Sequence, residues 1–137
     1  MASMSRKLGF ARPKVAVLSA TESILPNIPS SIEALEIARL AGERDPDADF
    51  FGPLSFDLAI SPKATLEKAI ANPVAGQANA LVVPDIVSGN ILFKTLVWCA
   101  GGLAAGLVAG GAVPIVLTSR SDPPEARLAA IALASLD

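Results

Sequence analysis

Apolar residues in this chain gather in short continuous runs, and the stretches between the runs have helical spacing or turn residues. Short apolar runs bounded by turn signals are typical of strands buried on both faces of a sheet. The runs predict strands at 14–20, 49–52, 80–83 and 113–117, with helices between them and after the last one. This alternation predicts the α/β class, with a mainly parallel sheet and helices on both faces as in a three-layer sandwich.

The length of the chain predicts one domain, with room for a sizeable core. Residues 1–13 form a lead-in segment that ends at a proline, and residues 14–137 are expected to form a single α/β domain. The first residues lack the apolar stretch of a secretory signal. The lone Cys99 cannot form an internal disulfide and is expected to be an inert thiol, so we expect a cytoplasmic setting.

Capping residues suggest where several helices begin. Ser30 and Glu33 have the spacing of a capping box. A further helix is expected from about Ser88, after the strand at 80–83. Asp122, which is followed by two prolines, has the character of an N-cap for the last helix.

The run from Thr95 to Thr118 carries no charge and is long enough to suggest a membrane span. Its glycines at 102, 106 and 110 have the spacing of a transmembrane packing motif. Five glycines make the run a poor membrane segment, however, because glycine adds little to the free energy of transfer into lipid. The favoured interpretation is a buried helix that lies close to a sheet, with no membrane partner.

The amino-acid composition limits the kinds of binding and catalysis that this chain can support. A net charge of −2 provides no basic surface for nucleic acid. The chain contains no histidine, which removes the commonest general base and the commonest metal ligand, and we expect no metal site. Any reaction would rest on carboxylates, lysine, arginine, hydroxyl groups, backbone amides or the substrate itself.

Two polar clusters stand at the ends of predicted strands, where open α/β sheets bind ligands. Between Ile70 and Ser119 the only charged residues are Asp85 and Lys94. A helix that opens at Gly89 and Asn90 would offer amide donors to a phosphate, and Lys94 lies one turn further on the same face. The alternative is an ordinary cap and turn, with Lys94 extending from the edge of the core to solvent.

Ser119 and Arg120 follow the strand at 113–117. The planar fork of Arg120 matches the oxygens of phosphate or carboxylate, and Ser119 can donate a hydrogen bond to the same group. The alternative is a solvated loop in which Arg120 pairs with Asp122.

These clusters resemble a known family. The segments 82–85, 89–94 and 114–122 are similar to the C-terminal part of phosphate acetyltransferases and phosphate butyryltransferases, and the resemblance spans 11–134. It implies the fold of isocitrate and isopropylmalate dehydrogenases, and exchange of phosphate and coenzyme A on an acyl group. Coenzyme A would then be a substrate, with no bound cofactor. The resemblance assigns catalytic roles to Ser119 and Arg120, and substrate binding to Gly89, Asn90 and Lys94.

Members of that family are much longer than this chain, and their N-terminal half supplies the other wall of the cleft. We therefore expect a fragment or shortened paralogue with an incomplete cleft, weak or inactive alone. Its partners would be acyl-CoA, phosphate or acyl phosphate, and a second copy or a separate N-terminal acyltransferase domain. The alternative is a non-catalytic α/β module that acts through oligomerisation or such a partner. Ala126 stands where the acetyltransferase branch has an acidic residue, so that role is not transferred to this chain.

Overall fold

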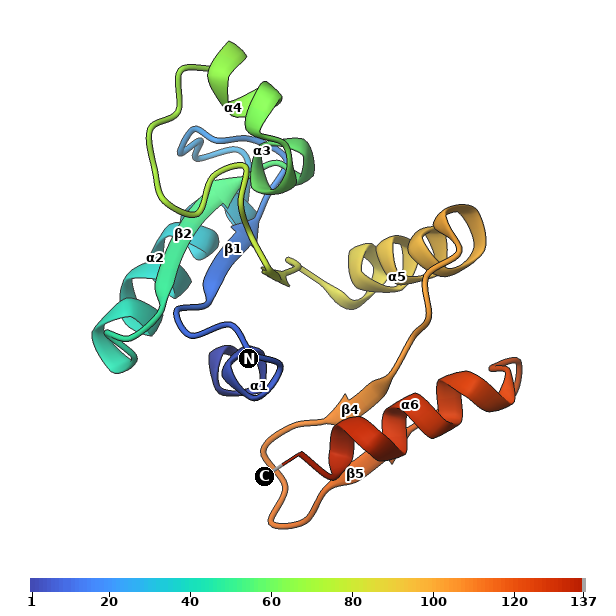
Figure 1. The fold of residues 1–137 in the computed structure, drawn as a ribbon. Coiled ribbons are helices and arrows are strands. Elements are labelled where there is room, and N and C mark those ends of the chain that lie inside the picture. The colour runs from blue at the N-terminus through green and yellow to red at the C-terminus, as the bar shows by residue number, and fades with distance from the viewer. Residues whose placement is uncertain (137) are drawn as a thin grey trace. The chain divides into compact units, whose positions relative to one another are not determined.

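The computed structural model describes residues 1–136 and divides into two compact units. The N-terminal unit comprises Met1–Gly89, and the C-terminal unit begins at Asn90. The expectation of a single domain over 14–137 stays a prediction. Figure 1 follows the order of the elements along the chain.

The N-terminal unit is built on a three-stranded parallel sheet with strand order β2-β1-β3. Lys14 of β1 pairs with Asp49 of β2, and Val15 pairs with Ala80 of β3. The α/β class and the parallel pairing of these strands are thereby confirmed. The elements are α1 (Ala2–Lys7), β1 (Lys14–Leu18), α2 (Pro29–Arg44), β2 (Asp49–Leu54), α3 (Phe56–Ile60), α4 (Pro62–Glu67) and β3 (Ala80–Val82).

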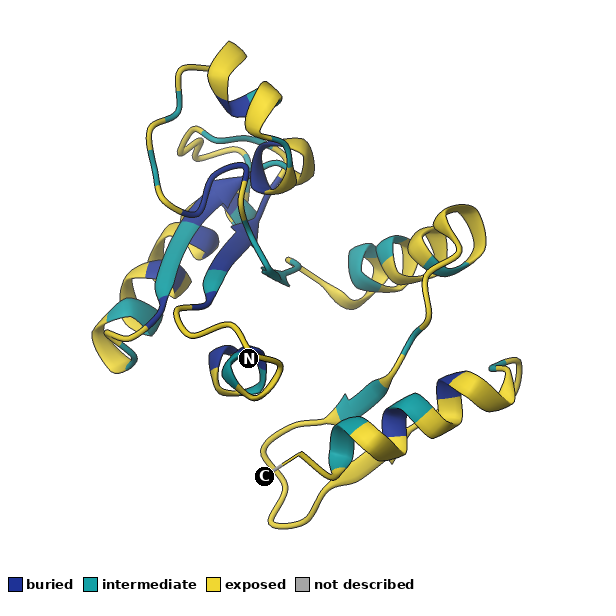
Figure 2. Cartoon of the chain, in the orientation of Figure 1, coloured by how far each residue is buried: buried dark blue, intermediate teal, exposed yellow. Residues whose placement is uncertain are grey.

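Burial of β1 on both of its faces explains its continuous apolar run. Val15 and Ala16 are fully buried although successive side chains of a strand point to opposite faces. On one face, Ala34 and Ala38 of α2 form a buried cluster with Val17. Figure 2 shows the buried residues concentrated along β1, the end of β2 and the sheet-facing side of α2. Alanines one helical turn apart let α2 approach the sheet closely.

Residues 1–13 contain a helix that sequence analysis did not anticipate. Ala2 of α1 is buried in a cluster with Val15 and Ala48. The Arg6 guanidinium holds the Asp45 carboxylate with two hydrogen bonds, of 2.6 and 3.2 Å. The lead-in therefore belongs to the folded N-terminal unit.

The C-terminal unit has its own small sheet. Its elements are α5 (Ile86–Ala100), which begins in the N-terminal unit, β4 (Gly106–Val108), β5 (Ile115–Leu117) and α6 (Pro124–Ala134). β4 and β5 pair antiparallel, with Leu107 opposite Val116. The expectation that the 113–117 strand joins the parallel sheet is therefore wrong for the described residues. Ala126 and Ala130 of α6 are buried one helical turn apart.

The prediction of a buried helix in the first part of the uncharged run, before the strand at 113–117, is also wrong for the described residues. α5 ends at Ala100, where Gly101 takes a positive φ of 68°, and none of its residues is buried. Gly106 lies in β4, where a Cβ atom would collide with the carbonyl oxygen of Leu117. Gly106 therefore allows β4 and β5 to lie close together. Across residues 1–136, no helix is long and apolar enough to cross a membrane.

Candidate functional site

Asp85 begins the first polar cluster and caps α5. Its Oδ1 accepts a hydrogen bond from the Ser88 amide at 2.8 Å, and its Oδ2 accepts one from the Ser88 hydroxyl, also at 2.8 Å. These bonds favour the charged carboxylate, and the amide bond contributes most to lowering the pKa of Asp85. The helix begins at Ile86, so the predicted start near Ser88 is wrong by about half a turn.

Because α5 begins at Ile86, the amide of Gly89 lies inside the helix and not at its first turn. This amide donates to the carbonyl oxygen of Asp85 at 3.1 Å, so it is not a free donor for an anion. The proposed amide cradle at Gly89 is therefore wrong. A Cβ atom at Gly89 would lie 3.0 Å from a methyl carbon of Val83, so the absence of a side chain serves packing against the preceding segment. Assignment of Gly89 to substrate binding stays a prediction.

Asn90 and Lys94 lie four residues apart on α5, which places them on one face of the helix as expected. Both side chains are exposed. Lys94 forms no ion pair within residues 1–136, although other lysines of the chain do, such as Lys68 with Glu22 at 2.8 Å. An exposed amide and an unpaired ammonium on one face are suited to bind an anionic group.

Ser119 and Arg120 lie in the turn between β5 and α6, directly after the strand as expected. Asp122 closes this turn: its carboxylate accepts the Ser119 amide, and its own amide donates to the Ser119 carbonyl at 3.2 Å. Asp122 is thus not the N-cap of α6, a position held by Pro123 without a side-chain hydrogen bond. The Ser119 hydroxyl lies 3.2 Å from that of Ser121.

Arg120 itself is exposed and has no hydrogen bond or ion pair in the described part of the chain. The alternative in which it pairs with Asp122 does not hold, because that carboxylate is directed to the Ser119 amide. All the donors of the guanidinium are therefore available to a planar or tetrahedral anion.

The structure brings these residues together in two pairs, Asn90 with Lys94 and Ser119 with Arg120. Among residues 1–136 no hydrogen bond or ion pair joins one pair to the other. Sequence reasoning missed the structural roles of Asp85 and Asp122. A usable signal was present, because an Asp and a Ser three residues apart can close a turn through a side-chain carboxylate.

Comparison with known proteins gives the same family for nearly the whole chain. Residues 1–135 match the phosphate acetyl/butaryl transferase family. The phosphate acetyltransferase of Rhizobium meliloti is 47% identical over 130 residues, which are 94% of this chain and 41% of that protein. The phosphate butyryltransferase of Clostridium acetobutylicum is 34% identical over 97% of this chain and 44% of its own length.

A solved structure agrees with these relatives. The crystal structure of a branched-chain phosphotransacylase from Enterococcus faecalis V583 has a TM-score of 0.86 and 41% identity, covering 97% of this chain and 48% of that one. This chain thus spans less than half the length of the relatives it matches. By the match over residues 1–135 and by these likenesses, the chain belongs to the phosphate acetyl/butaryl transferase family.

Proposed function

We propose that this chain is the C-terminal portion of a phosphate acyltransferase, which converts acyl-CoA and phosphate to acyl phosphate and coenzyme A. The observation that carries the proposal is the Ser119–Arg120 turn, in which Asp122 fixes the backbone and leaves the guanidinium unpaired. Family membership supports the same reaction. We further propose that the complete protein has the three-layer fold of the isocitrate and isopropylmalate dehydrogenases and works in the cytoplasm.

The reaction needs few groups from the protein. In the direction of acyl-CoA synthesis, the thiolate of coenzyme A attacks the acyl carbon, a carbon–sulfur bond forms, and the bond to the phosphate oxygen breaks. Arg120 would bind the departing phosphate, and the Ser119 hydroxyl would donate to the oxyanion that develops on the acyl oxygen. Lys94 and Asn90 would bind the anionic parts of the substrates, with coenzyme A as a substrate and no resident cofactor.

Half a cleft is expected to work poorly. Phosphate and coenzyme A together carry several negative charges, whereas Arg120 and Lys94 are the cations of the two clusters. Alignment of two substrates also requires groups on both sides of the reacting atoms. The isolated chain is therefore weak or inactive, and it functions as a homo-oligomer or with an N-terminal acyltransferase domain.

An assay of coenzyme A-dependent loss of acetyl phosphate and butyryl phosphate tests this proposal. We expect little turnover by the chain alone, and turnover when it is co-expressed with the N-terminal half of the Rhizobium meliloti relative. Arg120→Ala should lower that activity at least about a hundredfold, as for loss of a group that stabilises transition-state charge. Arg127→Ala, an exposed arginine on α6, is the matched control and should retain activity. Rapid turnover by the isolated chain, or equal activity of both variants, would contradict the proposal.

A second candidate is a non-catalytic module that acts through association. The observation in its favour is α5, whose apolar residues include Ile86, Ile91 and Trp98 and of which none is buried. Such a surface usually contacts another protein. Analytical ultracentrifugation that shows a monomer at high concentration, with and without an N-terminal half, would exclude this candidate.

A further inference from the structure

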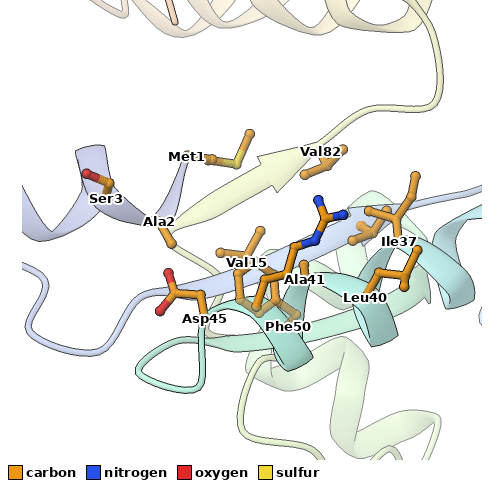
Figure 3. A pocket seen from close by; sticks show the side chains of 12 residues that line it. Met1, Ala2, Ser3, Val15, Ile37, Leu40, Ala41, Asp45, Phe50 and Val82 are labelled. Carbon is orange, nitrogen blue, oxygen red and sulfur yellow. The ribbon is translucent and has the colours of Figure 1, made fainter. Parts of the chain in front are cut away.

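The N-terminal unit contains an apolar cavity of about 530 Å³ on one face of its parallel sheet. Val15, Phe50 and Val82 contribute to it from the three strands, and Ile37 and Leu40 contribute from α2. Met1, the N-cap residue of α1, also lines the cavity. Figure 3 shows these side chains directed toward the same space.

Neither neighbouring helix fills this cavity. Ile37 is 44% exposed and Leu40 is 39% exposed, although both lie on α2 beside the core. α1 has only six residues, and its Arg6 is paired with Asp45, which itself lines the cavity. The faces of parallel sheets are normally covered by helices, so an apolar gap between two helices is the place for a further one.

We infer that this cavity receives an apolar helix from the N-terminal half of a phosphate acyltransferase, an inference that rests on the proposed function. The first argument is length: the matched relatives have more than half of their residues outside the region that this chain covers. Those residues are a source of a helix that the N-terminal unit does not itself supply.

The second argument is the chemistry of the lining. Small-molecule sites combine apolar walls with a few convergent polar groups. Here the polar groups are Ser3, Arg44 and Asp45, and the Asp45 carboxylate is already bound by Arg6. An apolar helix face fits such a lining better than the polar, anionic substrates of the family.

The third argument is charge. Arg44 is exposed and has no ion pair within residues 1–136. It stands in the last turn of α2, where the helix dipole favours a cation. In a symmetric dimer formed through this face, the cavities of the two copies would face each other. Arg44 would then lie near Arg44 of the second copy and would gain no acidic partner. The occupying helix should instead carry a carboxylate opposite Arg44.

Co-purification tests the inference. The full chain, carrying an affinity tag, is co-expressed with the N-terminal half of the Rhizobium meliloti phosphate acetyltransferase, and the two should be recovered in equal amounts. Ile37→Asp places a charge in the cavity and should lower the recovered half at least about tenfold, as for loss of a central apolar anchor. Leu66→Asp is the matched control, since Leu66 is 81% exposed on α4, outside the cavity, and should leave recovery unchanged.

A second variant separates docking from folding. Arg44→Glu reverses an exposed charge, so it should leave the circular dichroism spectrum unchanged and still lower recovery. Equal recovery with Ile37→Asp, Arg44→Glu and the parent chain, or no recovery at all, would overturn the inference. Self-association of the isolated chain that Ile37→Asp abolishes would do so too, by assigning the cavity to a second copy.

The two proposals fail in different ways. A complex that Ile37→Asp disrupts but that does not turn over acyl phosphate contradicts the proposed function and leaves the docking intact. An active complex that is insensitive to Ile37→Asp contradicts the docking alone. Binding of coenzyme A to the isolated chain, if Ile37→Asp abolished it, would assign the cavity to a small molecule and overturn the docking.

Discussion

At Gly52 two strands of the parallel sheet approach so closely that no side chain fits. A Cβ atom there would lie 2.6 Å from the carbonyl oxygen of Val17 and 2.9 Å from its Cβ atom. Both neighbours belong to β1, which is buried and has no room to shift. Gly52 is thus required by packing.

We expect Gly52→Ala to lower the free energy of unfolding by about 1–3 kcal/mol, the usual cost of overpacking a core. Urea unfolding followed by circular dichroism measures this change. Gly42→Ala is the control, because Gly42 lies inside α2 with nothing within 4 Å of the added methyl group. The control should be neutral or raise the free energy of unfolding by about 0.5–1 kcal/mol. Equal midpoints for the two variants would contradict this account.

Sequence analysis identified the residues of the polar clusters but not all of their bonds. It placed the helix start at Ser88 and a cap at Asp122, since Ser and Asp are both common N-caps. In the structure, Asp85 caps α5 through Ser88, and Asp122 turns back to Ser119. Several carboxylates and hydroxyls within a few residues can accept a hydrogen bond from the same amides. Which of them does so depends on the path of the backbone, which the sequence pattern does not specify.

Among the elements, α1 is held by an ion pair in addition to the burial of Ala2. Arg6 hydrogen-bonds Asp45, which lowers the pKa of that carboxyl below its ordinary value of 3.8. Arg12 likewise lowers the pKa of Asp49 through a hydrogen bond, at the start of β2. A lowered pKa in the folded state means that the contribution to stability is complete above the ordinary carboxyl pKa. It is lost as the pH falls through the lowered value.

We therefore expect Arg6→Gln to reduce stability at neutral pH and to have no effect in strong acid. The difference in free energy of unfolding between the parent chain and Arg6→Gln should be constant down to about pH 4 and vanish below the lowered pKa. Lys63→Gln is the control, because the Lys63–Glu67 pair, at 4.0 Å, lies within α4 and holds no helix in place. A difference that persists unchanged into strong acid would show that Arg6 acts through packing alone.

Sequence analysis found the three strands of the parallel sheet but assigned the last predicted strand to the wrong sheet. The runs around β1, β2 and β3 were recognised because each is a short apolar stretch bounded by turn residues, although only β1 is buried along nearly all of its length. The apolar run at 113–117 has the same appearance, yet β5 pairs antiparallel with β4. All three residues of β5 are exposed, so this apolar run indicated a strand without indicating its burial, its partner strand or its direction. β4 was not predicted, because it lies in a run that resembles a helix.

At the scale of the whole molecule, burial is distributed unevenly. The N-terminal unit contains nearly all the buried apolar residues, whereas those of the described C-terminal unit are Ala126 and Ala130. Two buried alanines provide little hydrophobic stabilisation for a helix and a two-stranded sheet. The C-terminal unit should therefore open far more readily.

Hydrogen exchange measures this difference directly. Amides of β1 should exchange by global unfolding, and amides of β5 and α6 should exchange orders of magnitude faster through local opening. Binding of an N-terminal half that completes the fold should slow exchange in the C-terminal unit most. Equal protection of β1 and α6 in the isolated chain would contradict the expected order of stability.

Trp98 has a consequence for any spectroscopic work on this molecule. It is the only tryptophan of the chain, and it lies on α5 with 73% of its surface in contact with solvent. We expect its emission to have the character of an indole in water, so melting of the parallel sheet should change the signal little. Tryptophan fluorescence is therefore a poor measure of unfolding of the N-terminal unit. It should instead report binding of another polypeptide to α5, by a shift of the emission to shorter wavelength.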